Sequence, residues 1–321
     1  MKTLNGLRWK PKWVSQLGCL QGCLDYLGVP VSDAWLFGIS GHAFVINIHE
    51  ELCPSGPTAW KTEHMTQLCQ NTGCKIRQVS AYKSQPDFTG KRETAWQEVR
   101  QAIDQGKPCC AWELKIPEFY VIHGYDETGY YFNGPLCDDG CGPLPWDKLA
   151  DTGIGWLNVS IIESAEAADP KAAICEALCF AQDHARHSEK WTFPGYATGL
   201  EGYQLWIASL EEKRGNGGAA YNAAVWSECR QNAPAFLVQA KSKLDERHTD
   251  TIEAAIGHYE IVAEKLRLVA DLFPFLGVSE QEQAMHLEDD ARRSRAIDAL
   301  RAAYSAEELG LGMLDQLANE L

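Results

Sequence analysis

Cysteine is the residue type in this sequence with the greatest capacity for chemistry, because its thiolate is both a nucleophile and a metal ligand. The chain contains 12 cysteines. Two thiolates that are four residues apart share one face of a helix and can bind the same zinc ion. Three pairs have this spacing: Cys19/Cys23, Cys137/Cys141 and Cys175/Cys179.

A structural zinc site usually needs four protein ligands. Cys137 and Cys141 lie in a loop rich in Gly and Pro and are the best candidates, but no second pair completes their ligand set. We therefore expect no metal and no other cofactor. We interpret the cysteines as buried thiols of a cytosolic chain rather than as a disulfide framework. His184 and His187 are three residues apart, and we interpret them as part of a solvated helix surface.

The composition and the charge narrow the classes of partner. The chain has 321 residues, of which 45% are hydrophobic and 23% are charged, as in a globular protein. A net charge of −15 argues against binding to nucleic acid or to an anionic membrane, because both require a basic surface. The sequence contains no run of 18 or more apolar residues, so we expect no transmembrane helix. The first residues also lack the apolar stretch of a secretory signal. We expect a cytoplasmic protein; its oligomeric state is not defined by the sequence.

The character of the sequence changes near residue 164. Residues 1–163 are rich in Gly, Pro, Trp and β-branched runs, whereas residues 164–321 are rich in Ala, Leu, Glu, Lys and Arg at helical spacing. This contrast predicts an α+β domain over 1–163 and an all-α helical domain over 164–321.

Apolar periodicity and turn residues place the elements that would position any site. In the first domain they predict helices at 15–27, 31–37, 58–72 and 94–105, and strands at 43–48, 75–79, 109–114, 119–125, 130–133 and 155–162. In the second domain they predict helices at 170–188, 196–213, 217–243, 249–273, 279–305 and 306–319.

Three stretches of the first domain carry a family resemblance. They are SQLGCLQGCLDYLG at 15–28, WLFGISGHAF at 35–44 with CPSGP at 53–57, and EFYVIHGYD at 118–126. Together they resemble the butirosin-biosynthesis protein H N-terminal family, a relative of the double-glycine bacteriocin-processing peptidases in the papain-like clan. The stretch TGLEGYQLW at 198–206 is similar to sequences that follow this domain. The resemblance implies a papain-like cysteine-peptidase fold, followed by the helical domain.

The same resemblance implies where the chemical centre should be. In the family, a cysteine begins the first helix, a histidine begins the strand before Gly-Tyr-Asp, and an Asp or Asn on the next strand orients the histidine. Here the cysteine position falls on Ser15 and the histidine position on Glu118, while the orienting position falls near Asn133 or Gly134. A carboxylate is a weak base toward a serine hydroxyl, so this pair suits a polar binding pocket better than catalysis. In such a pocket Glu118 either pairs with a cationic amine of a ligand or accepts hydrogen bonds from backbone donors.

A nearby thiol and imidazole offer an active alternative. Cys19 lies one helical turn after Ser15 and could be the nucleophile, with His123 as its base and Asn133 or Asp126 orienting that base. His123 is five residues after Glu118, and an odd offset puts two strand residues on opposite faces unless a β-bulge lies between them. Two further residues in family-like segments, His42 and Cys53, are expected to line the cleft.

Three hypotheses about function follow. The first is a degenerate thiol-hydrolase fold that binds a small molecule or a peptide. The second is an active amide hydrolase or acyltransferase that forms a thioester on Cys19. If the resemblance holds in detail, the acyltransferase would take its acyl group from a carrier protein, although an acidic chain does not favour docking an acidic partner. The third is a protein-interaction module whose interface is the helical domain.

Overall fold

The computed structural model describes residues 1–321, the side chain of Asn216 excepted. The chain has a mixed α+β architecture and divides into two compact units. Unit 1 comprises Met1–Ser32 and Gln70–Ala167, and unit 2 comprises Asp33–Cys69 and Ala168–Leu321. The last boundary between the two units along the chain falls at 167/168, four residues after the predicted domain boundary at 163/164.

The expectation that residues 33–69 belong to the first domain is corrected by this division. Helix α2 (Asp33–Ile39) packs against helix α8 (Asn216–Lys241) of unit 2. At Gly38 the two approach so closely that a Cβ atom would lie 2.0 Å from the ring of Phe236. This tertiary packing assigns the segment to the helical unit, and local sequence character does not reveal it.

Unit 1 is built on a seven-stranded antiparallel sheet in the order β3-β8-β4-β5-β6-β7, with β1 paired to β5. The strands are β1 (Lys2–Thr3), β3 (Cys74–Tyr82), β4 (Cys109–Trp112), β5 (Phe119–Tyr125), β6 (Gly129–Gly134), β7 (Cys137–Pro145) and β8 (Trp156–Ser164). Strand β5 has the predicted bounds. Strand β7 was not predicted, because its Asp-, Gly- and Pro-rich sequence lacks the alternation of a strand.

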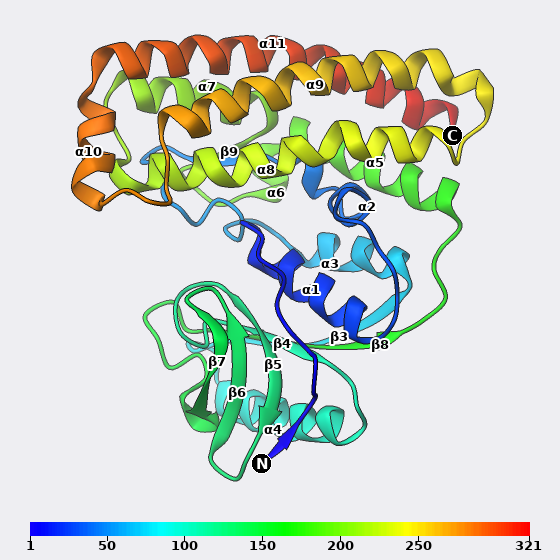
Figure 1. Cartoon of the computed structure of the whole chain (residues 1–321), viewed down its shortest axis with the longest axis vertical. Helices are drawn as coiled ribbons and strands as arrows, with labels where there is room; N and C mark the ends of the chain where they lie inside the picture. The colour runs from blue at the N-terminus through cyan, green and yellow to red at the C-terminus, as the bar shows by residue number, and fades with distance from the viewer. The chain divides into compact units, whose positions relative to one another are not determined.

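Two helices cover opposite faces of this sheet (Figure 1). Helix α1 (Ser15–Tyr26) lies on the face of Cys110, whose thiol interacts with that of Cys19. Helix α4 (Phe88–Asp104) lies on the other face, where the ring of Trp96 meets the ring of Tyr130 at 5.0 Å between centroids. Both helices were predicted, and α4 begins six residues before its expected start.

Unit 2 is mainly helical, but it is not all-α. Strands β2 (Asn47–His49) and β9 (Tyr196–Thr198) form a two-stranded antiparallel sheet inside it. The helices after α2 are α3 (Glu63–Cys69), α5 (Pro170–Arg186), α6 (Ser188–Trp191), α7 (Gly199–Glu211), α8, α9 (Thr249–Leu272), α10 (Glu280–Glu288) and α11 (Asp290–Glu320). Helix α9 packs along both α8 and α11 (Figure 1).

The predicted break between the last two helices at 305/306 is wrong. The break lies at Asp289, whose carboxylate accepts a hydrogen bond from the backbone N–H of Arg292 and so caps α11. Ser279 caps α10 through a reciprocal capping box with Glu282. Capping side chains thus define both helix starts.

A buried ion pair joins the helices of unit 2 to the segment after α2. Arg230 donates through Nε and Nη2 to the two carboxylate oxygens of Glu307, at 2.8 and 2.9 Å. Its remaining hydrogen bonds reach the backbone carbonyls of Ala43, Phe44 and Val45 at 2.8–2.9 Å. The two charged side chains are 0% and 1% exposed, so each depends on the other for compensation.

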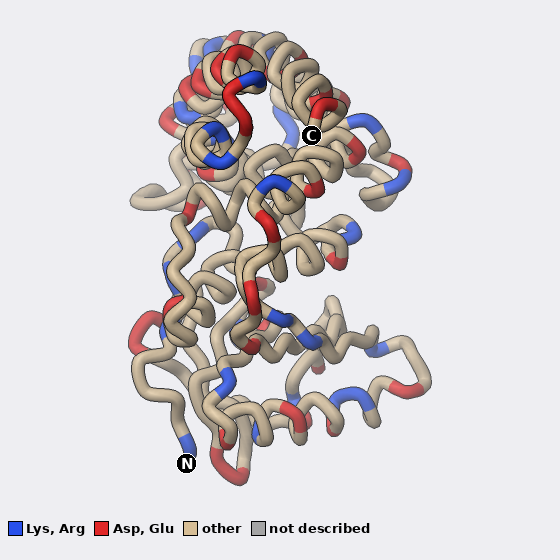
Figure 2. Tube along the Cα trace, turned by 90° about the vertical axis from the view of Figure 1, so that its right-hand side faces the viewer, with Lys and Arg blue, Asp and Glu red and all other residues tan. Residues whose placement is uncertain are grey.

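Among the described residues, no helix has both the length and the apolar character needed to cross a membrane. Figure 2 shows Lys and Arg residues interspersed with Asp and Glu residues along the trace.

Candidate functional site

Helix α1 begins at Ser15, and the chain before it lies tightly against the helix. The backbone N–H of Lys10 donates to the carbonyl of Gly18 at 3.1 Å. A Cβ atom at Gly18 would lie 2.3 Å from the carbonyl oxygen of Lys10, and one at Gly22 would lie 2.0 Å from that of Arg8. Only glycine allows this approach. The indole N–H of Trp9 also donates to the carbonyl of Ser15, at 3.2 Å.

The structure brings Ser15 and Glu118 together, although they are 103 residues apart. The Ser15 hydroxyl donates a short hydrogen bond to the Glu118 carboxylate. The Ser15 hydroxyl oxygen also accepts a hydrogen bond from the backbone N–H of Phe119, the first residue of β5, at 2.9 Å. Ser15 is 3% exposed, and Glu118 is half-buried. The pair therefore joins the start of α1 to the start of β5.

This pair has no group that could generate a strong nucleophile. Activation of a serine hydroxyl normally requires an imidazole or amine base. Among the described hydrogen bonds, the partners of the Ser15 hydroxyl are a carboxylate and a backbone amide. A carboxylate beside a hydroxyl is instead suited to binding a cation or a hydrogen-bond donor.

Cys19 is one turn further along α1 and is 0% exposed. Burial raises the pKa of its thiol well above the usual value, and its contact with the thiol of Cys110 raises that pKa further. Cys23 is equally buried, and burial raises its pKa in the same way. A thiolate is therefore disfavoured at both positions of this pair.

His123 lies at an irregularity of the kind that the active alternative required. The register between β5 and β6 shifts between Ile122 and Gly124, so His123 is the extra residue of a bulge. Its ring lies against strand β7, where a Cβ atom at Gly140 would be 3.4 Å from Nε2. Burial lowers the pKa of His123, and the nearby charge of Arg8 lowers it further.

Asn133 and Asp126, the two candidate orienting residues, have other partners. The Asn133 side chain accepts from the backbone N–H of Trp9 at 2.6 Å and donates to the carbonyl of Leu7 at 3.4 Å. Asp126 accepts from the Tyr131 hydroxyl and from the N–H of Thr128, both at 2.7 Å. No contact among the described residues joins Cys19 to His123. The structure thus does not assemble the Cys19–His123–Asn133 group that the active alternative requires.

The expectation that His42 lines a cleft is also corrected. His42 is 0% exposed in unit 2, where its ring stacks on Trp226 and its Nδ1 lies 3.4 Å from the thiol of Cys229. Cys53 is half-buried in the same unit and interacts with the Ser55 hydroxyl at 3.3 Å. His184, interpreted as solvated, is 1% exposed and packs edge-on against Trp60.

These two buried histidines predict a loss of stability in acid. Burial lowers the pKa of His42 to about 4 and that of His184 to about 3, whereas an unfolded histidine has a pKa of about 6.5. The unfolded chain therefore binds more protons than the folded protein. The contribution of the two neutral histidines to the free energy of unfolding is complete above pH ~6.5, and it is lost as the pH falls toward their pKa values in the folded protein. Each histidine can contribute up to about 1.4 kcal/mol per pH unit.

Urea denaturation at pH 7 and pH 5 checks this expectation. The free energy of unfolding should be lower at pH 5, and His184→Leu should reduce the difference by about half, whatever its effect at pH 7. A pH dependence that is the same in the wild type and in His184→Leu would contradict it.

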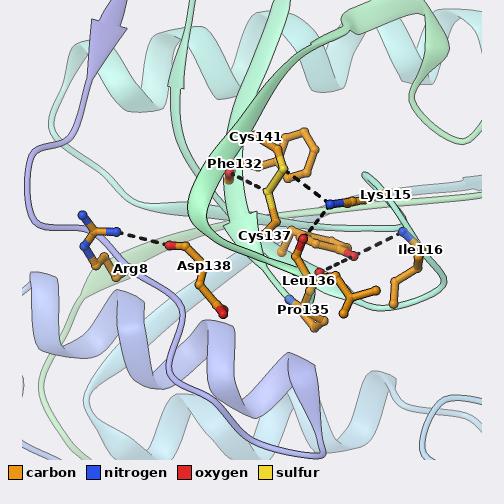
Figure 3. The surroundings of a disulfide bond; sticks show 10 residues. Arg8, Lys115, Ile116, Phe132, Pro135, Leu136, Cys137, Asp138 and Cys141 are labelled. Atoms are coloured by element: carbon orange, nitrogen blue, oxygen red, sulfur yellow. Dashed lines mark hydrogen bonds between the residues drawn. A yellow bond between two sulfur atoms is a disulfide. The ribbon is translucent and has the colours of Figure 1, made fainter. Parts of the chain in front are cut away.

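Cys137 and Cys141, the zinc candidates, instead form a disulfide, with their Cα atoms 5.9 Å apart (Figure 3). In the pairing of β6 with β7, Cys141 lies opposite Phe132 and Cys137 lies opposite Gly134. Strand β7 thus uses four residue steps where β6 uses two. The bond therefore closes a bulged stretch of β7. The other ten cysteines are free thiols.

Neither the comparison with models of protein families nor the comparison with curated proteins found a match for this chain.

Proposed function

We propose that unit 1 is a degenerate papain-like domain, related to the butirosin-biosynthesis protein H N-terminal family. In this proposal the Ser15–Glu118 site binds a small molecule or a peptide through a cationic amine and performs no covalent chemistry. The observation that carries it is the Ser15–Glu118 hydrogen bond, which occupies the junction between the start of α1 and the start of β5. A half-buried carboxylate at that junction is a natural partner for an ammonium group.

The active alternative has less support. It needs a reachable Cys19 thiolate with an imidazole beside it, but Cys19 is buried and its thiol lies against another thiol. The interaction-module alternative needs a broad exposed apolar surface on the helices. The large exposed apolar residues of α8, α9, α10 and α11 are Val238, Ile261, Met285 and Leu309, one on each helix. Single exposed residues of this kind require no partner.

The proposal retains a cytoplasmic location, since a reducing compartment suits a chain with ten free thiols. It includes neither nucleic acid nor a membrane as partner, because the net charge of −15 opposes both.

Binding of n-butylamine tests the proposal, with n-butanol as the uncharged control ligand. We expect n-butylamine to bind and Glu118→Gln to weaken that binding about 10-fold or more, because a hydrogen bond to a charged group contributes about 1.5–3 kcal/mol. Isothermal titration calorimetry or ligand-observed NMR would measure the affinity.

Glu113→Gln is the matched control, since Glu113 lies on the same segment but its carboxylate accepts from the Thr152 hydroxyl at 2.7 Å. Equal binding of the amine by the wild type and by Glu118→Gln would refute the proposal.

A further inference from the structure

The Cys137–Cys141 disulfide lies where two segments that lead to the Ser15–Glu118 site are attached (Figure 3). The first segment leads to Glu118. In it, the Lys115 ammonium donates to the carbonyl of Leu136 at 2.5 Å and lies 3.8 Å from the Cys141 sulfur. The segment is therefore anchored next to the disulfide, three residues before Glu118.

A second attachment holds the same segment. The backbone N–H of Ile116 donates to the Tyr120 hydroxyl at 3.2 Å, and that hydroxyl donates to the carbonyl of Pro135 at 3.1 Å. Pro135 and Leu136 directly precede Cys137 in the chain. Both attachments of the Glu118 segment thus reach the backbone immediately before the disulfide.

The other segment leads to Ser15. Arg8 donates through Nη1 to the carbonyl of Asp138, inside the loop that the disulfide closes, at 3.4 Å. Figure 3 shows Arg8 and Lys115 reaching this loop from two sides. The disulfide thus restrains a loop that contacts both segments of the site.

The two cysteines differ in exposure. Cys137 is 5% exposed, whereas Cys141 is half-buried and lies between the exposed residues Gly140 and Gly142 of β7. We therefore expect a thiolate that approaches from solvent to attack Cys141 rather than Cys137. The Lys115 ammonium favours the approach of that anion, while the exposed carboxylates of Asp138 and Asp139 oppose it.

We propose that Cys137–Cys141 is a site of thiol–disulfide exchange with a dithiol reductant, and that its cleavage loosens and weakens the Ser15–Glu118 binding site. This inference rests on the proposed function only for the effect on ligand affinity. The effect of disulfide cleavage on the two attached segments of unit 1 is independent of any ligand.

The exchange is balanced in atoms and electrons. A thiolate of the dithiol attacks the Cys141 sulfur, the bond between the two cysteine sulfurs breaks, and Cys137 leaves as a thiolate. The second thiol of the dithiol then attacks the reductant sulfur that is bound to Cys141 in the mixed disulfide. This closes the disulfide of the reductant and releases the Cys141 thiolate beside Lys115. The dithiol loses two electrons and becomes a disulfide, and its two protons reach Cys137 and Cys141. The carbonyl of Phe132, 3.8 Å from the Cys137 sulfur, can accept from the new thiol.

Hydrogen exchange with and without dithiothreitol tests the structural part. We expect the backbone amides of Lys115, Ile116, Glu118 and Phe119 to exchange at least about 10-fold faster after reduction, since the attachments of this segment reach the released loop. Cys137→Ser/Cys141→Ser should exchange at the faster rate without reductant and should not respond to it. Lys115→Met should raise the rate while the disulfide is intact, whereas Lys148→Met, which removes an exposed lysine that pairs with Asp151, should not. Unchanged exchange on reduction overturns the inference.

The affinity for n-butylamine tests the functional part. We expect reduction to weaken binding about 5-fold or more in the wild type and to have no effect in Cys137→Ser/Cys141→Ser. Affinity that depends on Glu118 but not on the disulfide would overturn the inference and leave the proposed function intact. Affinity that does not depend on Glu118 would remove the proposed function, and hydrogen exchange would then decide the inference alone.

Discussion

Ser15→Cys/Glu118→His should create a reactive thiolate at the start of α1. The helix start favours a negative charge, and an imidazole at residue 118 would stabilise the thiolate as an ion pair. In Ser15→Cys alone, the Glu118 carboxylate would lie against the new thiol and oppose its ionisation. We expect the thiolate absorbance near 240 nm to appear about two pH units lower in the double variant than in the single variant, which is about a 100-fold difference in thiolate.

Difference titrations against the wild type would isolate the new thiol, because the wild type contains the ten native free thiols. Cys53→Ser in the reference protein and in both variants would remove a half-buried thiol as a source of background. Identical titrations of the single and the double variant would show that residues 15 and 118 do not occupy a thiol–imidazole geometry. That result would remove the main support for a papain-like origin.

Loss of the Glu307 carboxylate should strongly destabilise unit 2. Glu307→Gln would leave the Arg230 guanidinium without its counter-charge at a position with 0% exposure. Breaking a buried ion pair by removal of one partner costs about 3–5 kcal/mol. The Tyr203 hydroxyl, which donates to Glu307 at 3.1 Å, would also lose a charged acceptor. Urea denaturation would measure the loss in free energy of unfolding.

Arg301→Ala is the matched control for this prediction. Arg301 pairs with Glu211 at 2.9 Å, but the two side chains are 59% and 50% exposed. An exposed pair of this kind contributes at most about 1 kcal/mol. Equal losses in Glu307→Gln and in Arg301→Ala would contradict the account of the buried pair.

The position of the candidate site could be anticipated because it depends on local features. The apolar stripe from Leu17 to Leu24 predicts α1, and the run before Gly124 predicts β5. The resemblance then assigns Ser15 and Glu118 to the ends of those elements. It does not show which way His123 points, because that depends on a bulge in the pairing of β5 with β6.

The features that could not be anticipated are set by contacts distant in sequence. The division at residues 33–69 depends on the packing of α2 against α8, and the burial of His184 depends on Trp60. The disulfide depends on β7, whose strand pairing overrides a composition typical of a loop. None of these contacts leaves a periodic signal in the sequence.

Iodoacetamide labelling of the native protein near pH 6.5, followed by peptide-level mass spectrometry, tests the central claim most directly. The claim is that the site has no thiol nucleophile. Since burial raises the pKa of the Cys19 thiol, we expect Cys19 to remain unlabelled while the exposed Cys179 is labelled slowly. Rapid and selective labelling of Cys19 would contradict the account and identify Cys19 as the nucleophile of an active thiol enzyme.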